Sequence, residues 1–145
     1  DFQCALGISQ LTKLPTWINK RRDIAEMYND AFLDNPYIEP LETRSDNSHA
    51  YHLYVIKILF NKLNINRQEL FSSMRDNGIG VNVHYIPVHL HPYYKRQCGT
   101  ELGLCPNAEK AYEEILSLPI FPSMSQQEVL KVITNLSSII NSSIK

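Results

Sequence analysis

The fourteen residues from Asn82 to Lys95 form the densest group of side chains in this sequence that could do chemistry. They include three of the five histidines, two prolines and the pair Tyr93-Tyr94. A short apolar alternation enters this run after Gly78-Ile79-Gly80, and Pro87 then removes a backbone hydrogen-bond donor. The pattern predicts a strand that ends and becomes a loop, where side chains commonly face a cleft. We therefore expect the functional site in this run.

Two kinds of chemistry are open to these side chains. A metal site could use His84, His89 and His91 with Cys98 and Cys105, because neutral imidazole and thiolate are suitable ligands. Their spacing matches no structural zinc pattern, so hydrogen-bonded loop histidines are the preferred interpretation and no metal is expected. Cys98 is the only cysteine near histidines, but nothing else supports a nucleophilic role for it. The roles of His89, His91, Cys98 and Cys105 stay open.

Two further motifs are less specific. Gly78-Ile79-Gly80 is the only Gly-x-Gly in the sequence, and it lies at a predicted helix-to-strand turn with no phosphate-binding loop after it. A structural role is the better interpretation. Tyr93 and Tyr94 follow a His-Pro pair and could line a pocket as readily as pack on a core, so both alternatives remain.

The composition limits the class of protein. The 145 residues suffice for one domain with a hydrophobic core, and 43% of them are hydrophobic. With 20% charged residues and a formal net charge of -1, there is no electrostatic case for binding nucleic acid or an anionic membrane. The basic triplet Lys20-Arg21-Arg22 is predicted to be a solvated helix face. No apolar stretch approaches the roughly 20 residues that span a bilayer, and a cytoplasmic protein with reduced thiols is expected.

Helices and strands are predicted to alternate along the chain. Two helices open it, at about residues 1–13 and 15–32, because Pro15 suits a first helical turn. Capping boxes begin two more helices, one at Asn66 with Glu69 and one at Ser125 with Glu128. The first of these is expected to end near residue 77. The other expected elements are a strand over about 50–60, a strand beside it over 79–85, a helix over 106–116 and an extended segment over 117–122.

The last helix is predicted to cover a sheet. Its apolar residues recur at helical spacing, and they are Val129, Ile133, Leu136 and Ile140. Strands and helices that alternate in this way are typical of an α+β fold. We expect a small, mostly antiparallel sheet covered by helices on one face, preceded by a long kinked helical segment.

Four motifs together resemble one known family, the DegT/StrS group of pyridoxal-phosphate-dependent nucleotide-sugar aminotransferases. They are Asp1–Leu11, Lys20–Tyr28, Val83–Tyr94, and Ala108-Glu109 followed by Leu116–Pro119. Each motif alone is weak, but their order and spacing are specific, and the resemblance covers essentially the whole chain.

The resemblance implies a particular part of a fold-type I aminotransferase. Residues 1–33 would be leading helices that link to a large domain, and residues 34–145 would be the small C-terminal α+β domain. In this family the large domain carries the lysine that binds pyridoxal phosphate, and no lysine here lies in a sequence resembling that motif. The isolated chain is therefore expected to bind no cofactor and to be inactive.

The resemblance also implies a substrate contact. Asn82, Val83, His84 and Tyr85 align with a stretch that contacts the sugar nucleotide, while no catalytic, cofactor-binding or metal-binding residue is expected in this chain. The complete enzyme would move an amino group, usually from glutamate, to a keto-sugar nucleotide in amino-sugar or surface polysaccharide biosynthesis, and would be a homodimer. The alternative is a stand-alone, non-catalytic ligand-binding or interaction module.

Overall fold

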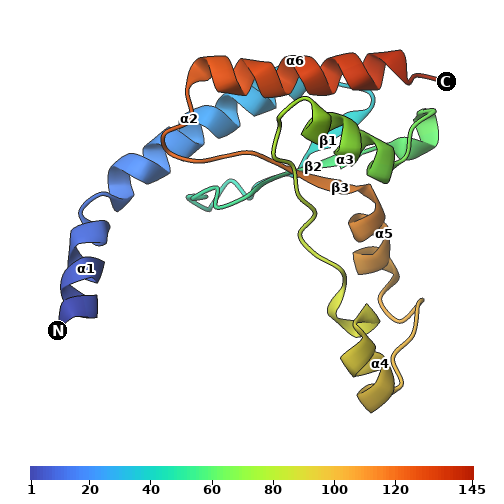
Figure 1. The fold of residues 1–145 in the computed structure, drawn as a ribbon, viewed down its shortest axis with the longest axis horizontal. Helices are drawn as coiled ribbons and strands as arrows, with labels where there is room; N and C mark the ends of the chain where they lie inside the picture. The colour runs from blue at the N-terminus through green and yellow to red at the C-terminus, as the bar shows by residue number, and fades with distance from the viewer.

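The computed structural model describes residues 1–145 and combines six α-helices with a three-stranded antiparallel sheet (Figure 1). The helices are α1 (Phe2–Leu11), α2 (Leu14–Phe32), α3 (Arg67–Asp76), α4 (Pro92–Cys98), α5 (Pro106–Glu114) and α6 (Gln126–Ser142). The strands are β1 (Ile38–Pro40), β2 (Tyr54–Ile58) and β3 (Ile115–Leu118), and the two 3-10 turns are η1 (Phe60–Lys62) and η2 (Val88–Leu90). The predicted α+β class is confirmed.

Strand β2 is the centre of the sheet and pairs antiparallel with β1 on one side and β3 on the other. Its side chains alternate as the pleat requires, so that Tyr54, Ile56 and Ile58 are buried while Val55 and Lys57 are only partly buried. Helices α2, α3 and α6 gather over one face of the sheet (Figure 1), and both α2 and α3 contact α6. The predicted small sheet covered by helices on one face is therefore confirmed.

The second half of α2 belongs to the hydrophobic core. Ile24, Ala25, Tyr28 and Phe32 recur at helical spacing and are buried. The Tyr28 hydroxyl donates a hydrogen bond to the carbonyl oxygen of Pro119, 2.9 Å away, and burial raises the pKa of this hydroxyl above its ordinary value. The core thus joins α2 to the segment that follows β3. The boundary at residue 33 between leading helices and a C-terminal domain stays a prediction.

The prediction of a solvated basic helix face is wrong for two of its three residues. Nη1 of Arg21 lies 2.9 Å from the carbonyl oxygen of Ile120 and 3.0 Å from that of Tyr51. Nε of Arg22 donates to the carbonyl oxygen of His49, 3.0 Å away. A guanidinium group offers several N–H donors in a fixed geometry, and here two such groups attach α2 to two loops.

Capping boxes begin α3 and α6, as predicted. The Asn66 side chain accepts from the backbone N–H of Glu69 at 3.0 Å, and the Glu69 carboxylate accepts from the backbone N–H of Asn66 at 2.9 Å. Ser125 and Glu128 make the same exchange at the start of α6. The buried face of α6 is formed by Val129, Val132, Leu136 and Ile140. The predicted stripe is confirmed, with Ile133 only partly buried but packed against the core.

The predicted strand over residues 79–85 is wrong. The backbone N–H of Val81 donates to the carbonyl oxygen of Ile79 at 3.0 Å, and this i to i+2 bond turns the chain out of an extended ladder. Only Asn82 pairs with the sheet, through an isolated bridge to Ser117 on β3. The segment therefore lies along the edge of β3 and not beside β2.

Two element boundaries also differ from the prediction. The strand expected over 50–60 is limited to Tyr54–Ile58, and the helix expected over 106–116 ends at Glu114. Ile115 has an extended backbone and begins β3, so the extended segment starts two residues earlier than predicted. Two short elements, β1 and α4, are not predicted, and α4 replaces part of an expected loop.

Two parts of the chain project away from α6 (Figure 1). One is α1, none of whose residues is buried. The other comprises residues 86–105, which we call the arm. The arm contains η2 and α4, and the chain then returns to the sheet through α5. None of the helices combines the length and apolarity needed to cross a membrane.

Candidate functional site

The predicted substrate-contact segment, residues 82–85, begins at the edge strand of the sheet. The backbone N–H of Asn82 donates to the carbonyl oxygen of Ser117 at 3.1 Å, and the N–H of Ser117 donates back to Asn82 at 2.7 Å. The Asn82 side-chain oxygen accepts from the backbone N–H of Val83 at 2.8 Å. The two backbone bonds hold the start of the segment on β3, and the side-chain bond is local to the segment.

His84 is held by the same residue of β3. Its Nδ1 lies 2.8 Å from the Oγ of Ser117, which is only 4% exposed. The ring of Tyr85 meets the His84 ring edge to face, with centroids 4.6 Å apart, and Tyr85 itself is 71% exposed. Neither Nε2 of His84 nor the Tyr85 hydroxyl makes a hydrogen bond within the chain. Both groups are therefore available to a ligand.

Val83 faces a different surface. It packs against the hydrophobic core and lines a hollow between α3 and α5. The other residues around this hollow are Asn66, Arg67, Gln68, Phe71 and Glu113. The Arg67 guanidinium group lies over the ring of Tyr112, 4.3 Å from its centroid, and its Nη1 is buried without a partner. Of the four predicted site residues, the structure therefore brings Asn82 and His84 together on Ser117, with Tyr85 against the His84 ring, while Val83 faces elsewhere.

Ser117 is the site residue that the sequence analysis does not single out. It lies inside the Leu116–Pro119 motif, which indicates the family but gives this serine no role of its own. The sequence does contain one signal for Ser117: it is the polar residue of the otherwise apolar strand Ile115–Leu118, and a buried polar residue needs a hydrogen-bond partner.

The other two histidines of the run, and the two cysteines that follow it, have separate environments. His89 pairs with Glu109, with 2.7 Å between Nε2 and Oε1, and Nε2 of His91 lies 3.3 Å from the carbonyl oxygen of Ile86. Cys98 and Cys105 are exposed free thiols. No group of three His, Cys, Asp or Glu side chains lies together in a way that could hold a metal ion. The alternative of a metal site therefore has no geometric support.

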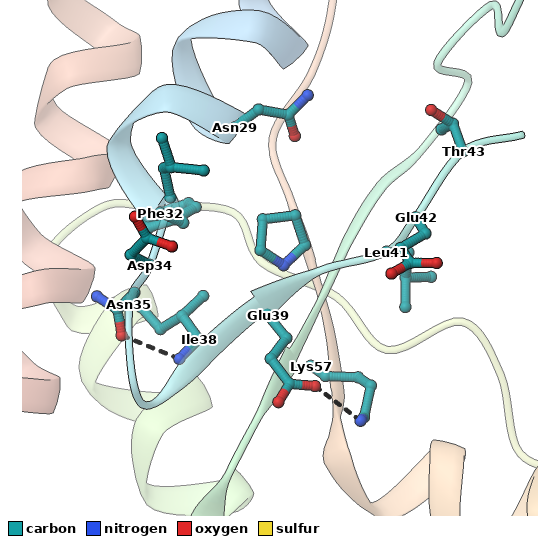
Figure 2. Close-up of a pocket in the computed structure, with 12 residues that line it drawn as sticks. Asn29, Phe32, Asp34, Asn35, Ile38, Glu39, Leu41, Glu42, Thr43 and Lys57 are labelled. Carbon is teal, nitrogen blue, oxygen red and sulfur yellow. Dashed lines mark hydrogen bonds and ion pairs between the residues drawn. The ribbon is translucent and has the colours of Figure 1, made fainter. Parts of the chain in front are cut away.

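A larger open hollow lies at the opposite edge of the sheet, beside β1 (Figure 2). Lys57 and Glu39, which are paired on β2 and β1, form an ion pair at its wall at 2.9 Å, and the Asn35 side chain accepts from the backbone N–H of Ile38 at 3.0 Å. The Asn29 side chain accepts from the Tyr54 hydroxyl. These polar groups are already paired within the chain, and the polar side chains of this hollow that remain free are Asp34, Glu42 and Thr43.

Comparison with known proteins identifies the class to which this fold and edge segment belong. A sequence model of the DegT/DnrJ/EryC1/StrS aminotransferase family matches residues 1–137, and the chain belongs to this family. The resemblance on which the sequence analysis relied is confirmed.

Two curated relatives illustrate the match. The chain is 41% identical over 134 residues to the spore coat polysaccharide biosynthesis protein SpsC of Bacillus subtilis (strain 168). This match covers 92% of the chain and 34% of SpsC. It is 38% identical over 140 residues to the UDP-4-amino-4,6-dideoxy-N-acetyl-beta-L-altrosamine transaminase of Campylobacter jejuni subsp. jejuni serotype O:2. This match covers 97% of the chain and 36% of the transaminase. The chain thus spans about a third of the length of these relatives.

Solved structures of aminotransferases also superpose on this chain. Helicobacter pylori PseC, an aminotransferase involved in the biosynthesis of pseudoaminic acid, superposes with a TM-score of 0.86 at 29% identity. The match covers 97% of this chain and 37% of PseC. S. venezuelae DesV, solved in complex with a ketimine intermediate, has a TM-score of 0.85 at 29% identity, with 95% and 36% covered. The fold is therefore that of one part of a sugar aminotransferase.

Proposed function

We propose that this chain is part of a pyridoxal-phosphate-dependent aminotransferase that transfers an amino group, usually from glutamate, to a keto-sugar nucleotide. The observation that carries the proposal is the family match over residues 1–137. The relatives named above support a role in amino-sugar or surface polysaccharide biosynthesis. The complete enzyme is proposed to be a homodimer, as the family resemblance implies.

Within this proposal, residues 82–85 contact the sugar nucleotide. The free Nε2 of His84 can bond a phosphate, keto or hydroxyl oxygen, and the exposed ring of Tyr85 offers an apolar face and a hydroxyl. The bonds from Asn82 and Ser117 hold these groups at one place on the sheet edge. Their contribution is orientation and exclusion of water, which lower a barrier by positioning alone.

Lys57 does not suit the role of the lysine that binds the cofactor. Lys57 is the lysine with acidic partners, and its Nζ lies 2.9 Å from Glu39 and 3.6 Å from Glu114. The hydrogen bond to Glu39, with the charge of both carboxylates, raises the pKa of Lys57. A lysine that forms a Schiff base must instead lose its proton readily. As the family resemblance implies, we assign the cofactor, which supplies the electron-sink chemistry when bound, to the large domain of the complete enzyme.

Activity of the complete gene product tests the overall proposal. We expect the complete protein to bind pyridoxal phosphate with a visible absorbance and to aminate a keto-sugar nucleotide in the presence of glutamate. A complete gene product without a cofactor-binding lysine, or one that binds the sugar nucleotide without turnover, would support the stand-alone binding module instead.

The substitution His84→Ala tests the substrate contact. Loss of one hydrogen bond to the sugar nucleotide is expected to lower kcat/KM for that substrate about 10-fold. The reaction with the amino donor and the cofactor absorbance are expected to stay unchanged. His52→Ala is the matched control, because the His52 side chain is exposed and makes no hydrogen bond. Unchanged sugar-nucleotide kinetics in His84→Ala would remove His84 from the site.

A further inference from the structure

Ser117 is the only buried residue of this chain outside the apolar and tyrosine side chains of the core. A hydroxyl group removed from water destabilises the fold unless it makes a hydrogen bond. The only side-chain hydrogen bond of Ser117 is to Nδ1 of His84, at 2.8 Å. The two backbone bonds between Ser117 and Asn82 fix the distance at which this contact forms. The contact between Ser117 and His84 is therefore held in place by the backbone of the sheet edge.

The direction of this hydrogen bond follows from what else the Ser117 hydroxyl can reach. If Nδ1 of His84 carried the proton, Ser117 would accept, and its own hydroxyl hydrogen would be buried with no acceptor. If the Ser117 hydroxyl donates to Nδ1, its hydrogen is satisfied and only a lone pair lacks a partner, which is the smaller penalty. In a neutral imidazole the proton then lies on Nε2.

We propose that Ser117 is a positioning residue that fixes His84 as the Nε2–H tautomer, so that His84 donates a hydrogen bond to an acceptor oxygen of the sugar nucleotide. The identity of the ligand rests on the proposed function, whereas the tautomer rests only on the contact between the two side chains. A fixed donor discriminates in favour of groups that only accept, such as the phosphate oxygens and the keto oxygen of the substrate. The edge contact of Tyr85 holds the other side of the ring.

Nitrogen-15 NMR of histidine in the complete gene product tests the tautomer without using activity. At a pH where the imidazole is neutral, His84 is expected to show a protonated Nε2 and an unprotonated Nδ1, with the signals assigned by comparison with His84→Ala. In Ser117→Ala the fixed donor is lost, and the two tautomers are expected to mix. A protonated Nδ1 in the unsubstituted protein, or the same spectrum in both proteins, would overturn the proposal.

Steady-state kinetics test the role. Ser117→Ala is expected to raise KM for the sugar nucleotide about 5-fold while leaving kcat of the amino-donor reaction unchanged, since one oriented hydrogen bond is weakened. Ser117→Thr keeps a hydroxyl and is expected to restore both KM and the tautomer. Ser138→Ala on the exposed side of α6 is the control for loss of a serine. An unchanged KM in Ser117→Ala, or a Thr variant that folds but does not rescue, would overturn the positioning role.

A nucleoside diphosphate without a sugar, used as an inhibitor, identifies the acceptor. If its inhibition constant rises in Ser117→Ala as much as KM does, the acceptor is an oxygen of the nucleoside diphosphate part; if only KM rises, the acceptor is an oxygen of the transferred sugar. If the protein does not act on sugar nucleotides, the proposed function fails, while the NMR result still decides the tautomer.

Discussion

Nε2 of His89 lies 2.7 Å from Oε1 of Glu109, and this pair joins the arm to helix α5. Only 10% and 12% of the two side chains are exposed. Glu109 also accepts from the backbone N–H groups of Gly103 at 2.9 Å and Cys105 at 3.2 Å. Burial acts to raise the pKa of Glu109, but the hydrogen bonds from His89, Gly103 and Cys105 outweigh it and leave that pKa below its ordinary value. One carboxylate therefore holds both ends of the arm.

Removal of this carboxylate is expected to loosen the arm without unfolding the core. In Glu109→Ala, hydrogen exchange of the backbone amides in residues 86–105 should become faster, because His89 and two N–H groups lose their partner. Amides of β2 and α6 should exchange as before. Glu113→Ala is the control, since Glu113 lies on the same helix, is exposed and makes no hydrogen bond. Unchanged exchange in the arm would show that Glu109 does not hold it.

The same contact predicts a dependence on pH. The pKa of Glu109 is lower in the folded arm than its ordinary value of 4.5, so the ionised carboxylate stabilises the arm above that pH. The contribution should be lost as the pH falls through the lower pKa of the folded state. Hydrogen exchange of residues 86–105, measured between neutral and acid pH, checks this expectation. Glu109→Gln should abolish the dependence, and an arm that loosens equally in that variant would contradict it.

The structure shows which elements local sequence signals can predict. Helices α3 and α6 begin where their capping boxes predict, because Asn66 with Glu69 and Ser125 with Glu128 are partners only three residues apart. The end of α5 was not predictable in the same way. Ile115 and Leu116 continue an apolar pattern that suits helix and strand equally, and their pairing with β2 selects the strand.

The residues of the candidate site also differ in whether the sequence can predict them. The resemblance leads to His84, although the strand that the local pattern predicts there is replaced by a segment with a single bridge to β3. Ser117 could not be found this way, because it lies 33 residues further along the chain and meets His84 only through the fold. The pairing of His89 with Glu109 is likewise a contact between distant residues, and it replaces the open alternatives for His89 with a structural role.

The cap of α6 is expected to contribute measurably to stability. Ser125→Ala should lower the free energy of unfolding by about 1 kcal/mol, because the backbone N–H of Glu128 loses its acceptor. Bonds from the backbone N–H and the hydroxyl of Ser125 also lower the pKa of Glu128, against the opposing effect of burial. Urea unfolding of the 145-residue chain measures the change. Ser138→Ala in the exposed middle of α6 should be nearly neutral, and an equal loss in both variants would argue against the cap.

Two buried tyrosines should differ in what their hydroxyl groups contribute. Tyr28→Phe leaves the carbonyl oxygen of Pro119 without its donor and should lower the free energy of unfolding by about 1–2 kcal/mol. Tyr54→Phe removes a bond to the side chain of Asn29, which is exposed and can bond to water, so the loss should be about 0.5 kcal/mol. Thermal or urea unfolding compares the two variants. A larger loss for Tyr54→Phe would contradict this reasoning.

Helix α1 presents apolar side chains to solvent, and its residues should contribute to surface properties more than to stability. Phe2 is 84% exposed and Leu6 is 54% exposed, and α1 has no buried residue. In the 145-residue chain, the double substitution Phe2→Ser and Leu6→Gln should change the free energy of unfolding by less than about 0.5 kcal/mol. Fluorescence of a dye that binds exposed apolar surface should fall, because these side chains form such a surface.

Leu70→Ala provides the matched comparison for this last prediction. Leu70 is fully buried in α3, so its truncation should lower the free energy of unfolding by about 2–5 kcal/mol. Dye binding by folded Leu70→Ala should stay as in the unsubstituted chain, since no surface group changes. The two variants therefore separate exposed from buried apolar groups by opposite responses in the two measurements. A large loss of stability in the α1 variant would mean that α1 packs against the core in solution.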